Sequence, residues 1–294
     1  MKNLLFLLSL VFVTTGANAD FTVENIDGGV AVKLDGKLFA QYHEDYETKP
    51  VWHPIIGPDG RPMTRPLGEG DHPHHASFFF THGDVDGIDF WHKKGPIEHL
   101  EYLEKSGGDD KAVVTTRSAW KTKEGTVIGE EIRRSTFHVL DGQHVIDVDV
   151  TWTAGAEAVE FGATKEGGFG LRVPPQIVVK SGGKIINDSG EENERAWGQE
   201  AAWVDYYGKI DDATVGVAML THPKNVRHPV HWHVRTYGLF AAAPFMKQGM
   251  KLPTGAKINL HHRVIFHTGD VKEAKIAEQY EAYSKSEVTA PSKK

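Results

Sequence analysis

The sequence predicts an all-β protein, a large antiparallel β-sandwich with one helix near its C-terminus. About fifteen short segments have strand-like composition and are separated by Gly, Asp or Asn. No helical segments alternate with them, which argues against a parallel sheet built from βαβ units. One segment, residues 271–284, has the period of an amphipathic helix. Because no linker or repeat divides the chain, we expect a single sandwich domain over residues 20–285 and a disordered tail over 286–294.

The first nineteen residues have the pattern of a cleavable signal peptide. Lys2 supplies a positive charge, residues 4–13 form an apolar run, and Ala17 and Ala19 place small side chains before the expected cleavage point. A membrane-spanning helix needs about 20 apolar residues, and this run has half that length. We therefore expect export to the periplasm or the medium, with cleavage near Ala19 and no membrane span in the mature protein.

The clearest strand covers residues 144–152. Its side chains alternate strictly, with Ile, Val and Trp on one face and Asp and Thr on the other, which is typical of a half-buried strand. It follows the turn signal Asp141-Gly142 and therefore pairs with residues 126–140 in a hairpin. The other expected strands are residues 23–26, 30–34, 38–43, 77–81, 97–105, 112–121, 158–163, 184–187, 201–206, 214–220, 231–235 and 257–267.

Two further segments complete the prediction. Residues 49–70 contain five Pro and four Gly and are expected to form a long irregular loop of the kind that carries binding sites. The helix over 271–284 is expected to be capped by Asp270. Its apolar stripe, which should pack on the sheet, consists of Ala274, Ile276, Ala277 and Tyr280.

Composition narrows the possible chemistry. The chain of 294 residues has 33 Lys and Arg against 40 Asp and Glu, a net charge of −7, which argues against a nucleic-acid partner. It has no Cys, so thiol catalysis, thiolate metal sites and disulfides are excluded. We find no Gly-rich nucleotide-binding motif and no GxSxG elbow of serine hydrolases. Function must therefore be built from imidazole, carboxylate, guanidinium and aromatic groups.

The 17 His residues are clustered. The densest cluster contains His72, His74 and His75, and strand alternation in a second places His231, His233 and Arg235 on one face. Three interpretations remain open: imidazoles that support the fold, ligands of a metal ion, and acid–base catalysts. The sequence requires no cofactor, but a divalent metal is possible. Its ligands would be His72, His74, His231 and His233.

Aromatic and charged side chains near these clusters are of the kinds that bind sugars, whose C–H faces stack on rings and whose hydroxyls bind polar groups. Glu166 is a candidate acid or base, and Arg172 is a candidate clamp for an anionic group beside a Gly-rich segment that allows close backbone approach. The candidate aromatic side chains of the pocket are Tyr206, Trp232 and Tyr237.

Five segments in order resemble a known family. They are KPVWHP at 49–54, DHPHH at 71–75, GDVDGIDFW at 83–91, WVDY at 203–206 and WHVRTYGL at 232–239. Together, over residues 30 to 285, they are similar to exported bacterial proteins of uncharacterised function often labelled "methane oxygenase PmoA". The chain departs from that pattern at Ala76-Ser77, where the family has Arg-Gly, so any role of that Arg is absent here.

The resemblance implies a supersandwich fold similar to galactose-mutarotase-like carbohydrate enzymes. In that broader group a His acid and a Glu base lie on the concave face of a sheet and act on a sugar ring. The resemblance therefore implies that the corresponding work falls here to His75 or His233 together with Glu166.

The leading hypothesis is an exported enzyme that uses His and carboxylate groups for acid–base catalysis on a sugar or modified glycoside, by hydrolysis, elimination or epimerisation. His75, His233 and Glu166 are the expected catalytic residues. The expected substrate-binding residues are His72, His74, Arg172, Arg235, Tyr206, Trp232 and Tyr237. An essential acid–base His predicts a change in activity between about pH 5 and 8. The alternatives are a metal-dependent hydrolase or oxygenase and a non-catalytic glycan-binding protein.

Overall fold

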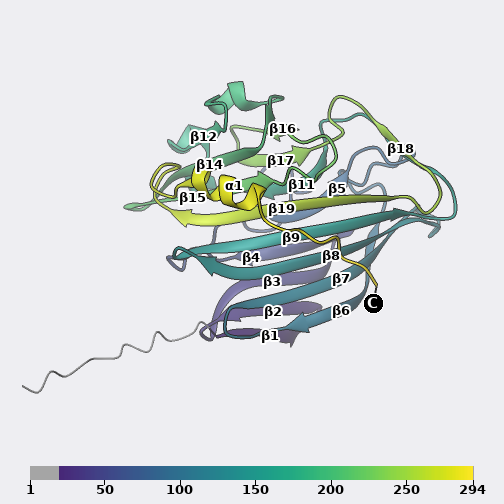
Figure 1. Cartoon of the computed structure of the whole chain (residues 1–294), viewed down its shortest axis with the longest axis horizontal. Helices are drawn as coiled ribbons and strands as arrows, with labels where there is room; N and C mark the ends of the chain where they lie inside the picture. The colour runs from purple at the N-terminus through teal and green to yellow at the C-terminus, as the bar shows by residue number, and fades with distance from the viewer. Residues whose placement is uncertain (1–19, 294) are drawn as a thin grey trace, which may run out of the picture.

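Two large antiparallel sheets packed face to face make up the fold in the computed structural model, which describes residues 20–293 (Figure 1). One sheet has nine strands and the other has eight, and a separate pair of short strands lies beside them. The predicted all-β sandwich is confirmed. The predicted signal peptide, residues 1–19, lies outside the described residues.

The elements of the nine-stranded sheet come from both halves of the chain. In spatial order they are β1 (Phe21–Ile26), β2 (Gly29–Leu34), β3 (Lys37–Tyr46), β4 (Lys49–Ile55), β5 (Phe78–His82), β11 (Gly167–Arg172), β17 (Leu239–Ala243), β16 (Val230–Val234) and β13 (Glu200–Ala201). This order brings the His-rich segments after β4 and in β16 towards the same half of one sheet.

The eight-stranded sheet consists, in spatial order, of β12 (Lys184–Asn187), β14 (Trp203–Ile210), β15 (Ala213–Thr221), β19 (Lys257–Thr268), β9 (Gln143–Ala154), β8 (Val127–Leu140), β7 (Lys111–Lys121) and β6 (Ile97–Ser106). The separate pair is β10 (Val159–Phe161) with β18 (Met250–Leu252). Three short 3₁₀ helices cover Pro175–Ile177, Val179–Ser181 and Asn193–Ala196, and one α-helix, α1, covers Ile276–Ser284.

The hairpin of β8 and β9 forms as predicted, with Leu140 opposite Gln143 across the Asp141-Gly142 turn. The apolar face of β9 is completely buried between the sheets, where it meets the inner face of β5 and β11 in one hydrophobic core. The side-chain period of two therefore decides which residues of each strand face the core and which face outward.

The prediction of an irregular loop over 49–70 is wrong for its first part, because residues 49–55 form β4 inside the nine-stranded sheet. Pro50 and Pro54 indicated a loop because proline has no N–H to donate to a neighbouring strand. The sheet accommodates them with sparse pairing: only Trp52 pairs with Phe78 of β5, and the register with β3 shifts twice.

The helix begins later than predicted. Asp270 does accept hydrogen bonds from the backbone N–H groups of Lys272 and Glu273 at 2.9 Å. However, Lys275 has a left-handed backbone with φ of 53°, so α1 starts only at Ile276. This break shifts the buried stripe: Ala277 is exposed, and Gln279 and Tyr283 are buried instead.

Residues 286–293, expected to be a disordered tail, are described as an extended segment that crosses the outer face of the eight-stranded sheet (Figure 1). Polar contacts connect it to the sheet at both ends. The backbone oxygen of Ser286 lies 3.2 Å from Nε2 of His222, and Lys293 pairs with Glu130 at 2.7 Å. The predicted boundary at 285 therefore falls where the helix ends and this segment begins.

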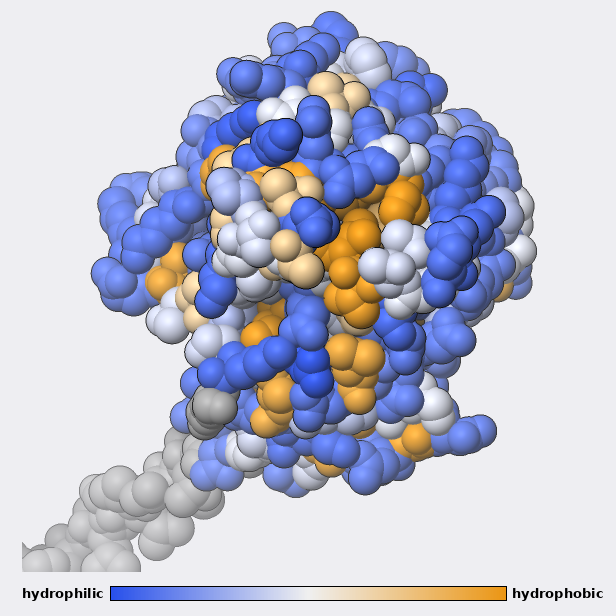
Figure 2. Space-filling model, turned by 90° about the vertical axis from the view of Figure 1, so that its right-hand side faces the viewer, coloured by the Kyte–Doolittle hydropathy of each residue, from blue (hydrophilic) through white to orange (hydrophobic). Residues whose placement is uncertain are grey.

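The surface is mostly hydrophilic. Figure 2 shows one end of the sandwich, where hydrophobic residues gather in a central band surrounded by hydrophilic ones. No helix within residues 20–293 is long and apolar enough to cross a membrane.

Candidate functional site

The candidate site lies on the outer face of the nine-stranded sheet, over β5, β11, β17 and β16. Strand alternation turns Phe79, Arg172, Ala241 and His233 to this face, while their sequence neighbours face the core between the sheets. Phe79 and Ala241 belong to a small hydrophobic cluster that also contains Trp91 and is separate from the main core. This cluster forms an apolar floor beneath the polar side chains.

The Gly-rich segment of β11 serves this floor. A Cβ atom on Gly170 would lie 2.6 Å from the ring of Phe79, so only glycine lets that ring lie across the strand. The predicted close approach is therefore an approach of a protein side chain to the backbone. Arg172, two residues later on the same face, extends over the floor towards the His cluster.

Two buried arginines hold the loop that carries the His cluster. Arg65 donates to the backbone oxygens of Asp71 and His72 at 2.6 and 3.0 Å. Arg172 pairs with the Asp71 carboxylate, 101 residues away in the sequence. Partial burial would raise the pKa of Asp71, but Arg172 outweighs it and the pKa is lowered. The Asp71 carboxylate is thus a fixed anion between two guanidinium groups.

His75 lies between two hydrogen-bond donors. The indole Nε1 of Trp91 donates to Nε2 of His75 at 3.2 Å, and Nη1 of Arg172 lies 3.2 Å from Nδ1. Both indole and guanidinium groups can only donate, and a neutral imidazole can accept at only one nitrogen. Burial, followed by the neighbouring His74 and Arg172, lowers the pKa of His75 strongly. The imidazole of His75 is therefore held in its neutral form, and both of its ring nitrogens are already in contact with protein groups.

Flat side chains stack beside His75. The ring of His72 lies parallel to that of Tyr237 with centroids 5.0 Å apart, and parallel to that of His75 at 5.1 Å. The guanidinium groups of Arg172 and Arg235 lie 4.6 and 5.6 Å from the centre of the Tyr237 ring. The predicted residues His72, His75, Arg172, Arg235 and Tyr237 thus form one continuous group.

His233 joins this group from β16. Its ring lies 6.1 Å from that of Trp91, which in turn contacts His75. Its Nδ1 is buried and has no hydrogen-bond partner within the described chain. Burial, followed by the positive charge of Lys165, lowers the pKa of His233 to about 4, although the nearby Glu166 opposes this shift. His233 is therefore a neutral imidazole at neutral pH.

Glu166 and His74 lie on the other side of the group. The ring of His74 is 4.6 Å from that of His92, whose Nδ1 lies 3.8 Å from the Glu166 carboxylate. Burial lowers the pKa of His74 to about 4. Residues 71–75, 166–172 and 233–237 therefore converge on one outer surface.

Two predicted residues lie elsewhere. Tyr206 and Trp232 face the core between the sheets and are completely buried. The hydroxyl of Tyr206 donates to the backbone oxygen of Thr236 at 2.9 Å, and the indole of Trp232 donates to Ala201 at 2.9 Å. The expectation that they contact a ligand is corrected to a packing role, because strand alternation directs both side chains inward.

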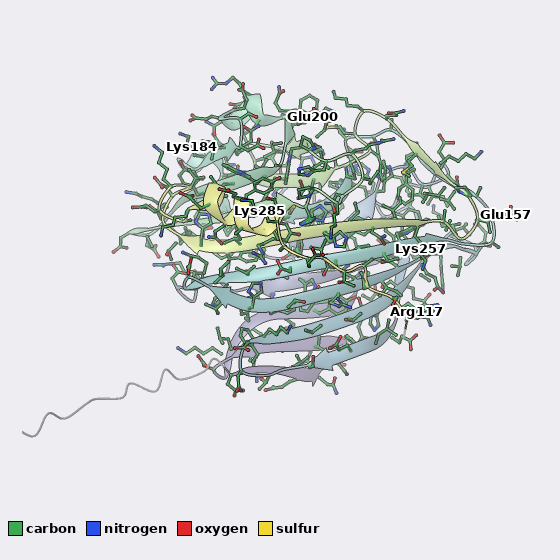
Figure 3. The ribbon with its side chains drawn as sticks, viewed as in Figure 1. Arg117, Glu157, Lys184, Glu200, Lys257 and Lys285 are labelled. Atoms are coloured by element: carbon green, nitrogen blue, oxygen red, sulfur yellow. The ribbon has the colours of Figure 1, made fainter. Side chains whose placement is uncertain are left out.

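The proposed metal ligands do not form a ligand set. Within residues 20–293, no group of three His, Asp or Glu side chains is arranged to hold a metal ion. His231 turns to the backbone oxygen of Gly198 at 3.0 Å and to Glu200, which lies near the top of Figure 3. The residues present therefore do not fit a metal site, and no step below depends on one.

Sequence reasoning missed three residues. Arg65 lies in the Pro-rich segment that was expected to be a loop, His92 follows Trp91, and Lys49 is a buried cation that donates to the backbone oxygen of His74 at 3.1 Å. Burial, followed by the charge of Lys93, lowers the pKa of Lys49 to about 8. A Lys inside an apolar strand such as KPVWHPI was a signal that a buried cation needs a specific partner.

A second polar cluster lies on the opposite side of the molecule, in a cavity of about 600 Å³ between the C-terminal segment and the eight-stranded sheet. Two of its carboxylates are paired with basic side chains. Arg263 donates two hydrogen bonds to Asp147 at 2.6 and 2.9 Å, and Asp149 accepts one from His261 at 2.6 Å. This arrangement is typical of side chains that stabilise a fold.

Several solved structures are distantly similar to this chain. An inferred aldose 1-epimerase from Escherichia coli K12 has a TM-score of 0.37 at 12% identity, covering 85% of this chain and 100% of that one. A galactose mutarotase related enzyme from Lactobacillus acidophilus has 0.29 at 11%, covering 84% and 97%. A polysaccharide lyase, BACCELL_00875, has 0.38 at 13%, covering 90% of this chain and 35% of the lyase. At these scores the similarity carries no argument about function.

Comparison with protein families gives a clearer result than comparison with solved structures. No curated protein matches the sequence. A family profile, however, matches residues 29–281, which include every strand from β2 to β19 and each segment that forms the candidate site. The chain therefore belongs to the family of unknown function DUF6807.

Proposed function

We propose that this protein is an exported carbohydrate-active enzyme that uses His and carboxylate groups for proton transfer on a sugar or glycoside. The observation that carries the proposal is the convergence of His233, Glu166 and the His72–His75 loop on one outer surface, above an apolar floor. Acid–base catalysis needs groups of different protonation state within reach of one substrate. These three segments bring together imidazole and carboxylate groups, which are the kinds of group that donate and accept protons.

The surroundings of each group suggest its role. His233 is neutral at neutral pH and has a buried nitrogen without a partner, which suits a proton acceptor. His72 is half-exposed, and its Nδ1 lies 3.1 Å from the Asp71 carboxylate, so its ring is oriented by protein and open to a substrate, and we assign it the role of proton donor. Glu166 is a second acceptor or a partner for hydroxyl groups. His75, whose nitrogens both contact protein donors, positions Trp91 and Arg172.

A sugar suits this surface because it combines flat rings with polar groups. Tyr237 and His72 offer stacked ring edges, and Arg235 and Glu166 offer a donor and an acceptor for hydroxyls. The signal-peptide pattern supports a location outside the cytoplasm, where glycans are encountered. The sequence also resembles proteins often labelled methane oxygenase PmoA. The proposed function nevertheless includes no oxygenase step, because the residues present do not fit a metal site.

The test compares two histidines of the same strand. Purified protein is incubated with free sugars and with oligosaccharides from xylan, β-glucan, starch, pectin and alginate, and products and anomer exchange are measured by NMR and mass spectrometry. We expect His233→Gln to lower the rate on the active substrate by about 10²- to 10⁴-fold. His231→Gln, on the same face but outside the site, is the matched control and keeps the rate.

Two outcomes would overturn the proposal. One is equal activity of His233→Gln and the wild-type protein. The other is the absence of any product across the panel. Glycan binding without product would instead support the non-catalytic binding protein.

A further inference from the structure

A small hollow lies beside the candidate site, at the end of β16. It has a volume of about 210 Å³ and is lined by Glu194, Trp197, Val234, Arg235 and Thr236. Arg235 belongs to both places, because its guanidinium also packs 5.6 Å from the ring of Tyr237. The hollow is therefore the immediate neighbour of the His72–Tyr237 stack.

Trp197 differs from every other tryptophan of the protein. The six others are at most 7% exposed, whereas Trp197 is 37% exposed. Among the large hydrophobic side chains exposed in residues 20–293, it is the only aromatic one. A single exposed apolar residue needs no explanation in itself. An exposed indole in a hollow with two charged groups offers a platform for stacking.

The backbone around Trp197 is held in place without a ligand. The Trp197 N–H donates to the backbone oxygen of Glu194 at 3.3 Å, at the end of the 3₁₀ helix Asn193–Ala196. The next residue, Gly198, donates to the backbone oxygen of Trp232 in β16 at 2.8 Å. The platform is thus anchored to the strand that carries His233, so little order has to be gained on binding.

The two charged groups of the hollow have no charged or hydrogen-bonding partner, although Arg235 packs against the ring of Tyr237. Glu194 and Arg235 form no ion pair or side-chain hydrogen bond with any residue in the described range 20–293, and they do not pair with each other. This contrasts with Arg65 and Arg172 nearby, which are both paired with Asp71. One free donor and one free acceptor therefore face the same small space as the exposed indole.

We propose that this hollow is a subsite for one neutral pyranose ring, adjoining the proton-transfer site. The indole of Trp197 stacks on the C–H face of the ring, Arg235 donates to its hydroxyls, and Glu194 accepts from them. The opposite charges of Arg235 and Glu194 favour a neutral sugar over an acidic one. The hollow is smaller than the pockets of about 300–1,000 Å³ that enclose drug-sized ligands, as expected for a single ring.

This inference rests on the proposed function and narrows its substrate. If one ring occupies the hollow while another lies over the His cluster, the substrate has at least two sugar units. The enzyme then acts on an oligosaccharide or polysaccharide in preference to a free monosaccharide.

Binding is tested separately from turnover by native gel electrophoresis in gels that contain soluble arabinoxylan, mixed-linkage β-glucan or galactomannan. We expect at least one of them to retard the wild-type protein and Trp197→Ala to weaken the apparent affinity about tenfold. Trp197→Phe, which keeps a ring, restores most of it. Leu100→Ala, an equally exposed site on β6, is the matched control and binds as the wild type does.

Further variants separate the two proposals. His233→Gln is expected to be retarded like the wild type although its rate is greatly lowered. Arg235→Gln is expected to bind more weakly without a change in thermal stability. The subsite is overturned if none of the three polysaccharides retards the wild type, or if Trp197→Ala binds as well as the wild type. Retardation by pectin or alginate alone, strengthened in Glu194→Gln, would overturn the neutral-sugar assignment.

Discussion

The outer faces of the two sheets carry similar polar residues, but the partners of those residues differ. On the eight-stranded sheet, Asp147 is bound by Arg263 and His138, and Asp149 by His261. On the nine-stranded sheet, His75 lies between two donors. Buried nitrogens without partners occur there in His74, His233, Arg65 and Arg172, whereas the buried atoms without partners on the outer side of the eight-stranded sheet are oxygens of Asp205, Gln279 and Tyr283.

The difference shows which face is built for stability. Paired charges satisfy one another and gain nothing from a ligand, whereas buried polar atoms without partners cost free energy in the free protein. Such a cost is typical of functional sites. The eight-stranded face has the larger cavity, but its Asp147 and Asp149 carboxylates are already paired with Arg263, His138 and His261.

The largest expected effect concerns the paired face. Asp147→Asn removes the carboxylate that binds Arg263 and His138, and we expect the free energy of unfolding to fall by about 2 kcal/mol, since the pair is partly exposed. Urea denaturation measures it. Asp141→Asn, in an exposed turn, is the control and leaves stability unchanged. If Asp147→Asn kept full stability but lost activity, the roles assigned to the two faces would be reversed.

The next effect concerns His75, which lies on the outer face of the nine-stranded sheet. Because His75 positions Trp91 and Arg172, His75→Gln is expected to reduce the rate about 10- to 100-fold and to leave the pH profile unchanged. The rate is measured across pH on whichever sugar of the panel is converted to product. A shifted pH profile in His75→Gln would show that His75 itself exchanges the proton.

A third effect distinguishes the faces by pH. The pKa of His233 is lowered to about 4, whereas Asp205 outweighs the effect of burial on His267, whose pKa is raised. His233 therefore favours the folded state above pH 6.5, and this contribution is lost as the pH falls towards 4. The contribution of His267 is present below pH 6.5 and is lost as the pH rises through its folded pKa.

NMR titration of the ring protons is expected to show these opposite shifts, and His267→Gln should destabilise the protein more at pH 5.5 than at pH 8.5. The sequence predicted a change in the enzyme rate between about pH 5 and 8, but the lowered pKa of His233 moves the fall in rate that its protonation causes to below about pH 5. A normal titration of both rings near pH 6.5 would contradict the distinction.

The smallest effect concerns the segment that covers the paired face. Lys293→Ala removes its ion pair with Glu130, and we expect a change in the free energy of unfolding of less than about 0.5 kcal/mol, because exposed pairs contribute little. Differential scanning calorimetry at low and high salt measures it. A larger loss that salt abolishes would mean that this pair holds the segment in place.

Much of the fold was predictable because strand alternation is a local signal. The β8–β9 hairpin, its turn and its buried face follow from residues within thirty positions of one another. The strands that were missed lacked that signal. In β4 two prolines masked the pattern, β11 is rich in glycine, and β17 is uniformly buried, so its residues do not alternate.

The candidate site was predictable only in part. The clustering of His residues and the face that carries His233 and Arg235 could be inferred from spacing. The partners of His75 could not, because Arg172 lies 97 residues away. The exposure of Trp197 could not be predicted, because nothing in the sequence distinguishes this exposed tryptophan from the six buried ones.

By itself, the sequence determined the chemistry available, which is imidazole, carboxylate and guanidinium without thiols, and the inner or outer side of each regular strand. Only the tertiary structure decided which of these groups are satisfied. A period of two places a side chain on a face, but hydrogen bonding requires a specific atom within about 3 Å. Asp71 receives its hydrogen bonds from Arg65 and from Arg172, which lies 101 residues away in the sequence. His75 contacts the same Arg172, which lies 97 residues from it.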